Sequence, residues 1–250
     1  MQGWKLFKHA VRMVVGNWRE VLRIFLVPSI IGIVFTVGLF LGLSSMIDPR
    51  LNHSNDAVFP VGLGVLCFVV LYAGIFAWCV VAWHRFVLLE EHPQGWLPRF
   101  HSDRILSYCW QVLKLTLVFL VVLIPVGFLV VFLLQASLVI GLLVGIPVYL
   151  LLIVFCIRLG PTLPAAAIGR PITLNDALEK TKGHAGTLIV LFLSIIGFQM
   201  LLQLPVFLTA IFVPIVSGVL SLCASVLASL LNISVLTTLH GCFIEGRSID

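Results

Sequence analysis

Four long stretches without a charged residue constrain this chain more than any other feature. They cover residues 24–47, 58–83, 115–157 and 183–244. A helix needs roughly 20 apolar residues to cross a hydrocarbon core of about 30 Å. The first two stretches suffice for one membrane span each, and the last two suffice for two spans each. The pattern therefore predicts six spans.

The composition leads to the same class of protein. Hydrophobic residues make up 61% of the chain and charged residues 10%, whereas about a quarter of residues are charged in a typical soluble domain. The first apolar stretch is longer than the core of a cleaved signal peptide, so we expect a retained helix. The six cysteines show no C-x-x-C pair, which is typical of buried apolar side chains.

The basic residues predict the orientation. With six spans, 14 of the 15 Lys and Arg residues fall on one side of the membrane, and Arg50 in the connecting loop 48–57 is the exception. The positive-inside rule then places both termini in the cytoplasm. Because no basic segment extends clear of the bilayer, we expect anionic headgroups, and not nucleic acid, to face these charges.

Residues 2–23 have the pattern of an amphipathic helix. Its apolar side chains recur at steps of three and four residues: Trp4, Phe7, Val11, Val14, Trp18 and Leu22. Its basic face carries Lys5, Lys8, Arg12, Arg19 and Arg23. We expect this helix to lie in the interface with its bases toward anionic lipid. A helix that binds a partner is the alternative.

Similar amphipathic stretches occur at residues 100–114 and after Thr173, which with Asp176 has the spacing of a capping box. Turns are expected at residues 135–137 and 214–218, and Pro28 in the first turn of the first span. The predicted fold is an all-α, six-helix transmembrane bundle in one domain, residues 1–250. Three helical hairpins, at about 1–98, 99–172 and 173–250, would each follow an amphipathic interfacial helix.

Two segments resemble a known group of proteins. They are DALEKTKGHAGTLIVL, residues 176–191, and FKHAVRMVVGNWREVLRIFLVP, residues 7–28. Both are similar to a recurring element of bacterial inner-membrane families, namely the YciC-like proteins and the membrane domain of some glycerophosphodiester phosphodiesterases. The resemblance implies a bacterial inner-membrane location and six helices. It implies no catalysis, because the phosphodiesterase activity belongs to a separate soluble domain.

Three basic side chains are predicted at the cytoplasmic ends of spans: Arg85, Arg158 and His240. The simpler interpretation is that they extend to lipid phosphates. The alternative is a ring that holds a lipid headgroup or another anion. Together with Lys5, Lys8 and Arg12 they are the candidate lipid or anion contacts.

Gln199 and Gln203, one turn apart, and Asn232 are the candidate polar residues inside the membrane. A hydrogen bond between helices is the simpler interpretation of these side chains. No charged residue lies near the middle of a span, whereas ion-coupled transporters usually carry one there.

The polar junction at residues 83–104 holds the densest set of potential ligands: His84, Glu90, Glu91, His92, His101 and Asp103. Their spacing matches no metal motif, so we expect salt bridges among Arg85, Glu90, Glu91 and Arg99. No catalytic, metal or cofactor site is predicted. We therefore expect a non-enzymatic scaffold or accessory subunit associated with lipid or a larger membrane complex. The alternative is a small transporter or channel for an apolar or neutral solute, and an intramembrane lipid enzyme is a third, more remote one.

Overall fold

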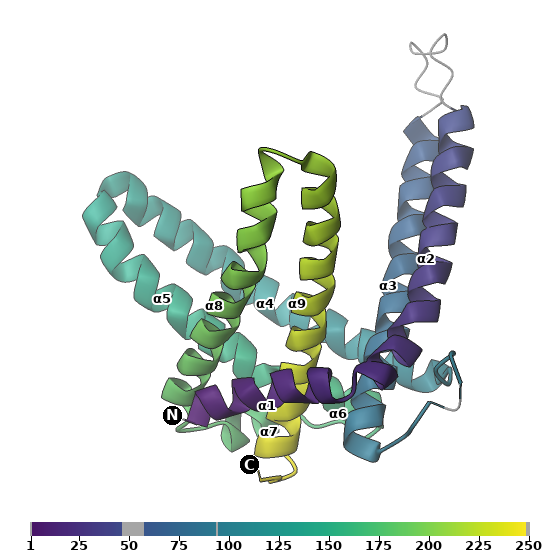
Figure 1. Ribbon diagram of the computed structural model, residues 1–250. Helices are drawn as coiled ribbons and strands as arrows, with labels where there is room; N and C mark the ends of the chain where they lie inside the picture. Colours follow the sequence, from purple (N-terminus) through teal and green to yellow (C-terminus); the bar gives the residue numbers. More distant parts are fainter. Residues whose placement is uncertain (1, 47–57, 94, 249–250) are drawn as a thin grey trace. The chain divides into compact units, whose positions relative to one another are not determined.

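The computed structural model describes residues 2–46, 58–93 and 95–248, and within these ranges helix is the only regular structure (Figure 1). The predicted external loop 48–57, with Arg50, falls outside them. The helices are α1 (Gln2–Gly16), α2 (Trp18–Met46), α3 (Val58–Leu89), α4 (Ser102–Ala136), α5 (Leu138–Leu159), α6 (Thr162–Ile168), α7 (Leu174–Lys180), α8 (Ala185–Ala210) and α9 (Pro214–Phe243).

Six of these helical segments are long and apolar enough to cross a membrane, which confirms the predicted all-α class and the number of spans. They are Trp18–Gly42, Gly62–Leu89, Ser102–Ala136, Leu138–Ile168, Ala185–Ala210 and Pro214–Phe243. Large apolar side chains such as Phe40, Phe128 and Phe207 are at least 70% exposed. Such surfaces are stable only against lipid or another apolar surface. The chain is therefore a multi-pass membrane protein.

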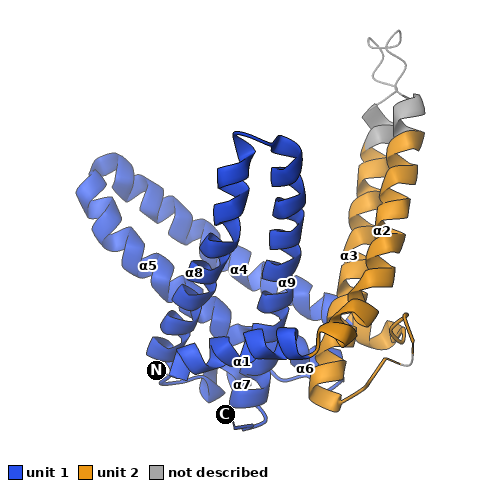
Figure 2. Cartoon of the chain, in the orientation of Figure 1, with its two compact units in different colours: residues 1–16, 107–250 blue, residues 17–106 orange. Residues whose placement is uncertain are grey.

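The chain divides into two compact units, residues 17–106 and residues 1–16 with 107–250 (Figure 2). In the first of these, α2 and α3 pack side by side. Trp83 is fully buried and its ring lies 6.4 Å from that of Phe25. Because α3 continues to Leu89, the first residues of the predicted polar junction belong to a helix.

The predicted amphipathic helix 2–23 is wrong at its end. Helix α1 stops at Gly16, and α2 begins at Trp18, with the Val21 N–H bonded to the Asn17 carbonyl at 2.9 Å. A Gly-Asn pair is a common helix break, and the apolar period continues across it, which hid the interruption. Pro28 lies inside α2 and not in its first turn.

Helix α1 packs against α8 and α9 (Figure 1). Its buried side consists of Gly3, Leu6, Phe7 and Ala10, while Trp4, predicted on the apolar face, is 50% exposed. A Cβ added at Gly3 would come within 2.9 Å of the Leu191 nitrogen. Contact with α8 therefore decides which side of α1 is buried. Gly3 lies where the backbones of α1 and α8 come closest.

The second predicted amphipathic helix does not exist as a separate element, because residues 102–136 form one continuous helix, α4. The predicted turn after α4 is confirmed at Ser137. Next to this turn, Gly141 lies against Leu134, and a Cβ added at Gly145 would come 3.1 Å from Val130. These two glycines let the start of α5 approach the end of α4.

The predicted capping box at the start of α7 is confirmed. The Asp176 N–H donates to Thr173 Oγ1 at 3.1 Å, and the Thr173 N–H donates to Asp176 Oδ2 at 3.0 Å. The last turn was predicted too late in the chain, since α8 ends at Ala210 and Pro214 already begins α9. Proline favours the first helical position, where its missing N–H is not needed. The threefold hairpin repeat and the single domain stay predictions.

Candidate functional site

Arg158, in the last turn of α5, connects two helices of its unit. Its Nε donates to Thr181 Oγ1 at 3.0 Å, and its Nη2 donates to the Leu178 carbonyl. Both acceptors lie at the C-terminal end of α7, where free carbonyls and the helix dipole favour a cation. The guanidinium therefore holds α7 against the end of α5.

His240 makes a similar connection at the end of α9. Its ring is 2% exposed, and Nδ1 lies 2.9 Å from the Pro161 carbonyl oxygen. Because a carbonyl only accepts hydrogen bonds, Nδ1 carries the proton and donates. Nearby, Lys180 Nζ donates to the Ile244 carbonyl at 3.2 Å. Three predicted basic groups of this unit thus bind main-chain carbonyls.

Around His240, the C-terminal half of α9 is packed and contains small polar side chains. Ser234, Thr237 and Thr238 are all buried, and the two threonines donate to carbonyls one turn earlier in the helix, both at 2.9 Å. None of these three residues is among the candidates predicted from the sequence. Their signal is the run of small hydroxyl residues in a span, which favours close helix packing.

The candidate polar residues in the membrane lie on α8 and α9. Gln199 Nε2 donates to Asn232 Oδ1 at 3.4 Å, which is the predicted type of hydrogen bond between helices. Gln203 and Gln199 line an open hollow of about 530 Å³ between α8 and α9, together with Ser225 and mainly apolar side chains such as Phe207. The arrangement offers amide groups to a neutral molecule or to another helix.

Lys5, Lys8 and Arg12 are exposed on α1, on the side away from its packed face. The helix carries no acidic residue. These three side chains are therefore available to an anion outside the protein.

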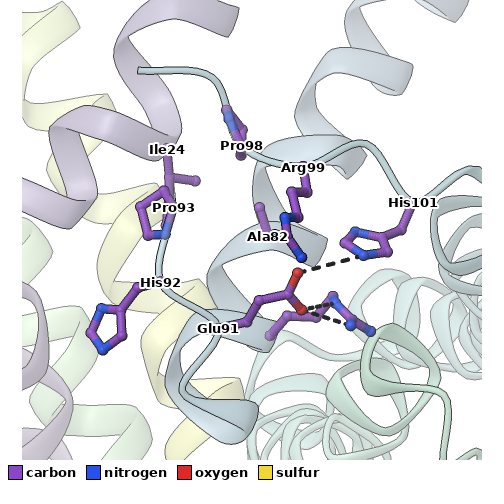
Figure 3. Close-up of a pocket in the computed structure, with 9 residues that line it drawn as sticks. Ile24, Ala82, Glu91, His92, Pro93, Pro98, Arg99 and His101 are labelled. Atoms are coloured by element: carbon purple, nitrogen blue, oxygen red, sulfur yellow. Dashed lines mark hydrogen bonds and ion pairs between the residues drawn. The ribbon is translucent and has the colours of Figure 1, made fainter. Parts of the chain in front are cut away.

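In the unit of residues 17–106, the polar junction contains a local ion-pair cluster. Arg85 Nη2 lies 2.6 Å from Glu91 Oε2, and His101 Nε2 lies 3.5 Å from Glu91 Oε1 (Figure 3). These groups line a cavity of about 20 Å³, roughly the space of one water molecule. The predicted salt bridge of Arg85 and Glu91 is confirmed, while Glu90 is exposed with a φ of 55° at the end of α3.

The predicted ring of basic side chains divides between the two units. Arg158 and His240 belong to one unit and Arg85 to the other, so the ring stays a prediction. Within the described ranges, no group of three or more His, Cys, Asp or Glu residues is placed to hold a metal ion.

Comparison with protein-family models, with curated proteins and with solved structures gave no match to this chain. The resemblance to the YciC-like proteins and to the phosphodiesterase membrane domain therefore stays a prediction from the quoted segments.

Proposed function

We propose that this chain is a non-enzymatic scaffold or accessory subunit of the bacterial inner membrane, with both termini in the cytoplasm. In this role it associates with anionic lipid or with a larger membrane complex. The main supporting observation is that three basic side chains at the ends of predicted spans form contacts within the protein. Arg158 and His240 bind main-chain carbonyls, and Arg85 binds Glu91. These contacts stabilise the fold and leave the groups poorly placed for acid–base chemistry.

The exposed helix surfaces support the same role. The 18-residue apolar windows of the six spans are between 6% and 33% buried within the chain. Side chains such as Phe132, Leu143 and Leu222 are exposed by more than two thirds. Surfaces of this kind allow lateral association with lipid or with other membrane helices.

The proposal is tested by mild detergent extraction of the tagged chain from its native membrane, followed by mass spectrometry. We expect one membrane protein or lipid class to be recovered at a constant ratio. If a protein is found, tagging that protein should recover this chain, and deleting this chain should reduce the assembly of the complex. Recovery of the chain alone, with no retained lipid or protein, would overturn the proposal.

The hollow beside Gln203 favours a second candidate, a transporter or channel for a neutral solute. Its amide groups offer hydrogen bonds without a charge. In proteoliposomes, a solute flux that Gln203→Leu abolishes while folding is retained would favour transport. A flux equal to that of protein-free vesicles would leave the scaffold proposal in place.

A further inference from the structure

Helix α1 crosses α8 (Figure 1). An apolar groove lies at this crossing. It has a volume of about 430 Å³ and is lined by Phe7, Lys8, Val11, Arg12, Val15 and Gly16 of α1 and by Phe198 of α8. The rings of Phe7 and Phe198 meet edge to face, with centroids 5.8 Å apart. Val15 is 67% exposed. The groove is therefore open and mainly apolar, and it lies where a short amphipathic helix meets a membrane span.

Two cations lie along this groove. Lys8 and Arg12 are four residues apart, so they occupy the same side of α1 one turn from each other. Both are exposed, and neither is in an ion pair among the described residues. Helix α1 itself has no acidic residue that could pair with these two cations. An anion is the complementary charge for this edge of the groove.

We propose that the groove binds an anionic phospholipid, with one acyl chain along Val11, Val15 and Phe198 and the phosphate between Lys8 and Arg12. Arginine and lysine both bind phosphate through charge-assisted hydrogen bonds. A molecule with a negative head and an apolar tail matches both parts of the site, while a free phosphate matches only the cations. The inference rests on the proposed function in one respect, since α1 must lie at a membrane surface.

The test uses the purified 250-residue chain in a neutral detergent, with bound lipid counted by native mass spectrometry. Three probes are titrated: phosphatidylglycerol, phosphatidylcholine with the same acyl chains, and glycerol phosphate. We expect one phosphatidylglycerol to bind at least tenfold more tightly than phosphatidylcholine. Glycerol phosphate should not compete at the same concentrations, because it has no chain to fill the groove.

Matched variants separate the site from general surface charge. Lys8→Gln with Arg12→Gln should weaken phosphatidylglycerol binding about thirtyfold, because a basic residue near an anionic lipid contributes about fivefold to affinity. Arg170→Gln with Lys182→Gln removes one arginine and one lysine charge from exposed positions of the same unit that do not line the groove. We expect that control to stay within about threefold of the original chain.

A third variant tests the apolar half of the site. Val15→Trp keeps both cations and fills the groove, so we expect about tenfold weaker phosphatidylglycerol binding at an unchanged unfolding temperature. Equal losses in the two charge variants, binding of glycerol phosphate as tight as that of the lipid, or unchanged binding by Val15→Trp would each overturn the inference. The scaffold proposal would survive that result, because its test measures partners retained from the native membrane.

Discussion

Arg158 Nε lies 3.0 Å from Thr181 Oγ1, and this contact joins the end of α5 to the C-terminus of α7. The same guanidinium donates to the Leu178 carbonyl. Thr181 is 1% exposed, so water does not easily replace the arginine at its hydroxyl. The basic group at this span end therefore acts first as a structural connection.

Replacing Arg158 with Gln should destabilise the protein by about 1.5 to 3 kcal/mol, because hydrogen bonds from a charged donor are lost to partly buried acceptors. Arg158→Lys should recover only part of this loss, since one ammonium group lacks the planar fork of arginine. The measurement is unfolding in detergent, with the exposed Lys182→Gln as control. An Arg158→Gln protein as stable as that control would contradict the structural role.

His240→Leu should destabilise the protein by about 1 to 3 kcal/mol, because the Pro161 carbonyl loses its donor in a buried position. His240→Asn places an amide N–H near the position of Nδ1 and should retain most of the stability. Thermal unfolding of both variants checks the prediction. Equal stability of the two variants would show that the hydrogen bond contributes nothing measurable.

Gly3→Ala should loosen α1 from α8, because the added Cβ would overlap the main chain near Leu191. Overpacking of this kind typically costs about 1 to 3 kcal/mol. Gly16→Ala is the matched control, since a Cβ there meets nothing within 4 Å. Hydrogen exchange of the α1 amides should rise in Gly3→Ala alone. Similar exchange in both variants would argue against the close contact.

The capping box gives α7 a defined pH dependence. Hydrogen bonds from the Thr173 side chain and N–H lower the pKa of Asp176 from its usual 3.8. Since the pKa is lower in the folded state, the carboxylate stabilises α7 above pH 3.8, and this contribution is lost as the pH falls through the folded-state pKa. Amide exchange in α7 should therefore differ between the original chain and Asp176→Asn at pH 6, and the difference should shrink below pH 3.8. A difference that persists unchanged to pH 2 would contradict this assignment.

Gln199 and Asn232 should be energetically coupled. A double-mutant cycle with alanine at both positions should give a coupling of about 0.6 kcal/mol, the average for hydrogen bonds between membrane helices. Gln203→Ala combined with Asn232→Ala is the control, since Gln203 lines the hollow. A coupling near zero for the Gln199 pair would show that the two amides act independently.

The features predicted correctly from the sequence depend on local physics. Apolar length indicates a span without knowledge of its neighbours, and the capping box of Thr173 and Asp176 involves residues three apart. The buried side of α1 was predicted incorrectly because distant partners decide it. Gly3 and Leu6 form the packed side of α1 because α8 and α9 lie against them, and an apolar period cannot distinguish lipid from a neighbouring helix.

The sequence predicts which residues belong to the candidate site better than it predicts what they do. Arg158 and His240 lie at the ends of predicted spans, but their acceptors are the carbonyls of Leu178 and Pro161, which are distant in the sequence. Every residue has a main-chain carbonyl, so a pattern of residue types cannot indicate which carbonyl will accept a hydrogen bond. The buried threonines of α9 were missed for a similar reason, since their burial depends on the packing around that helix.

The six-span topology with cytoplasmic basic ends is tested most directly by the sidedness of single cysteines, in a chain whose six native cysteines are replaced. Cysteine is placed at Lys8, at Lys182 and at Arg50, and intact cells receive a membrane-impermeant maleimide. We expect labelling at position 50 from outside, and labelling at positions 8 and 182 only after the membrane is opened. Labelling of position 8 or 182 from outside would contradict a six-span protein with its basic ends in the cytoplasm.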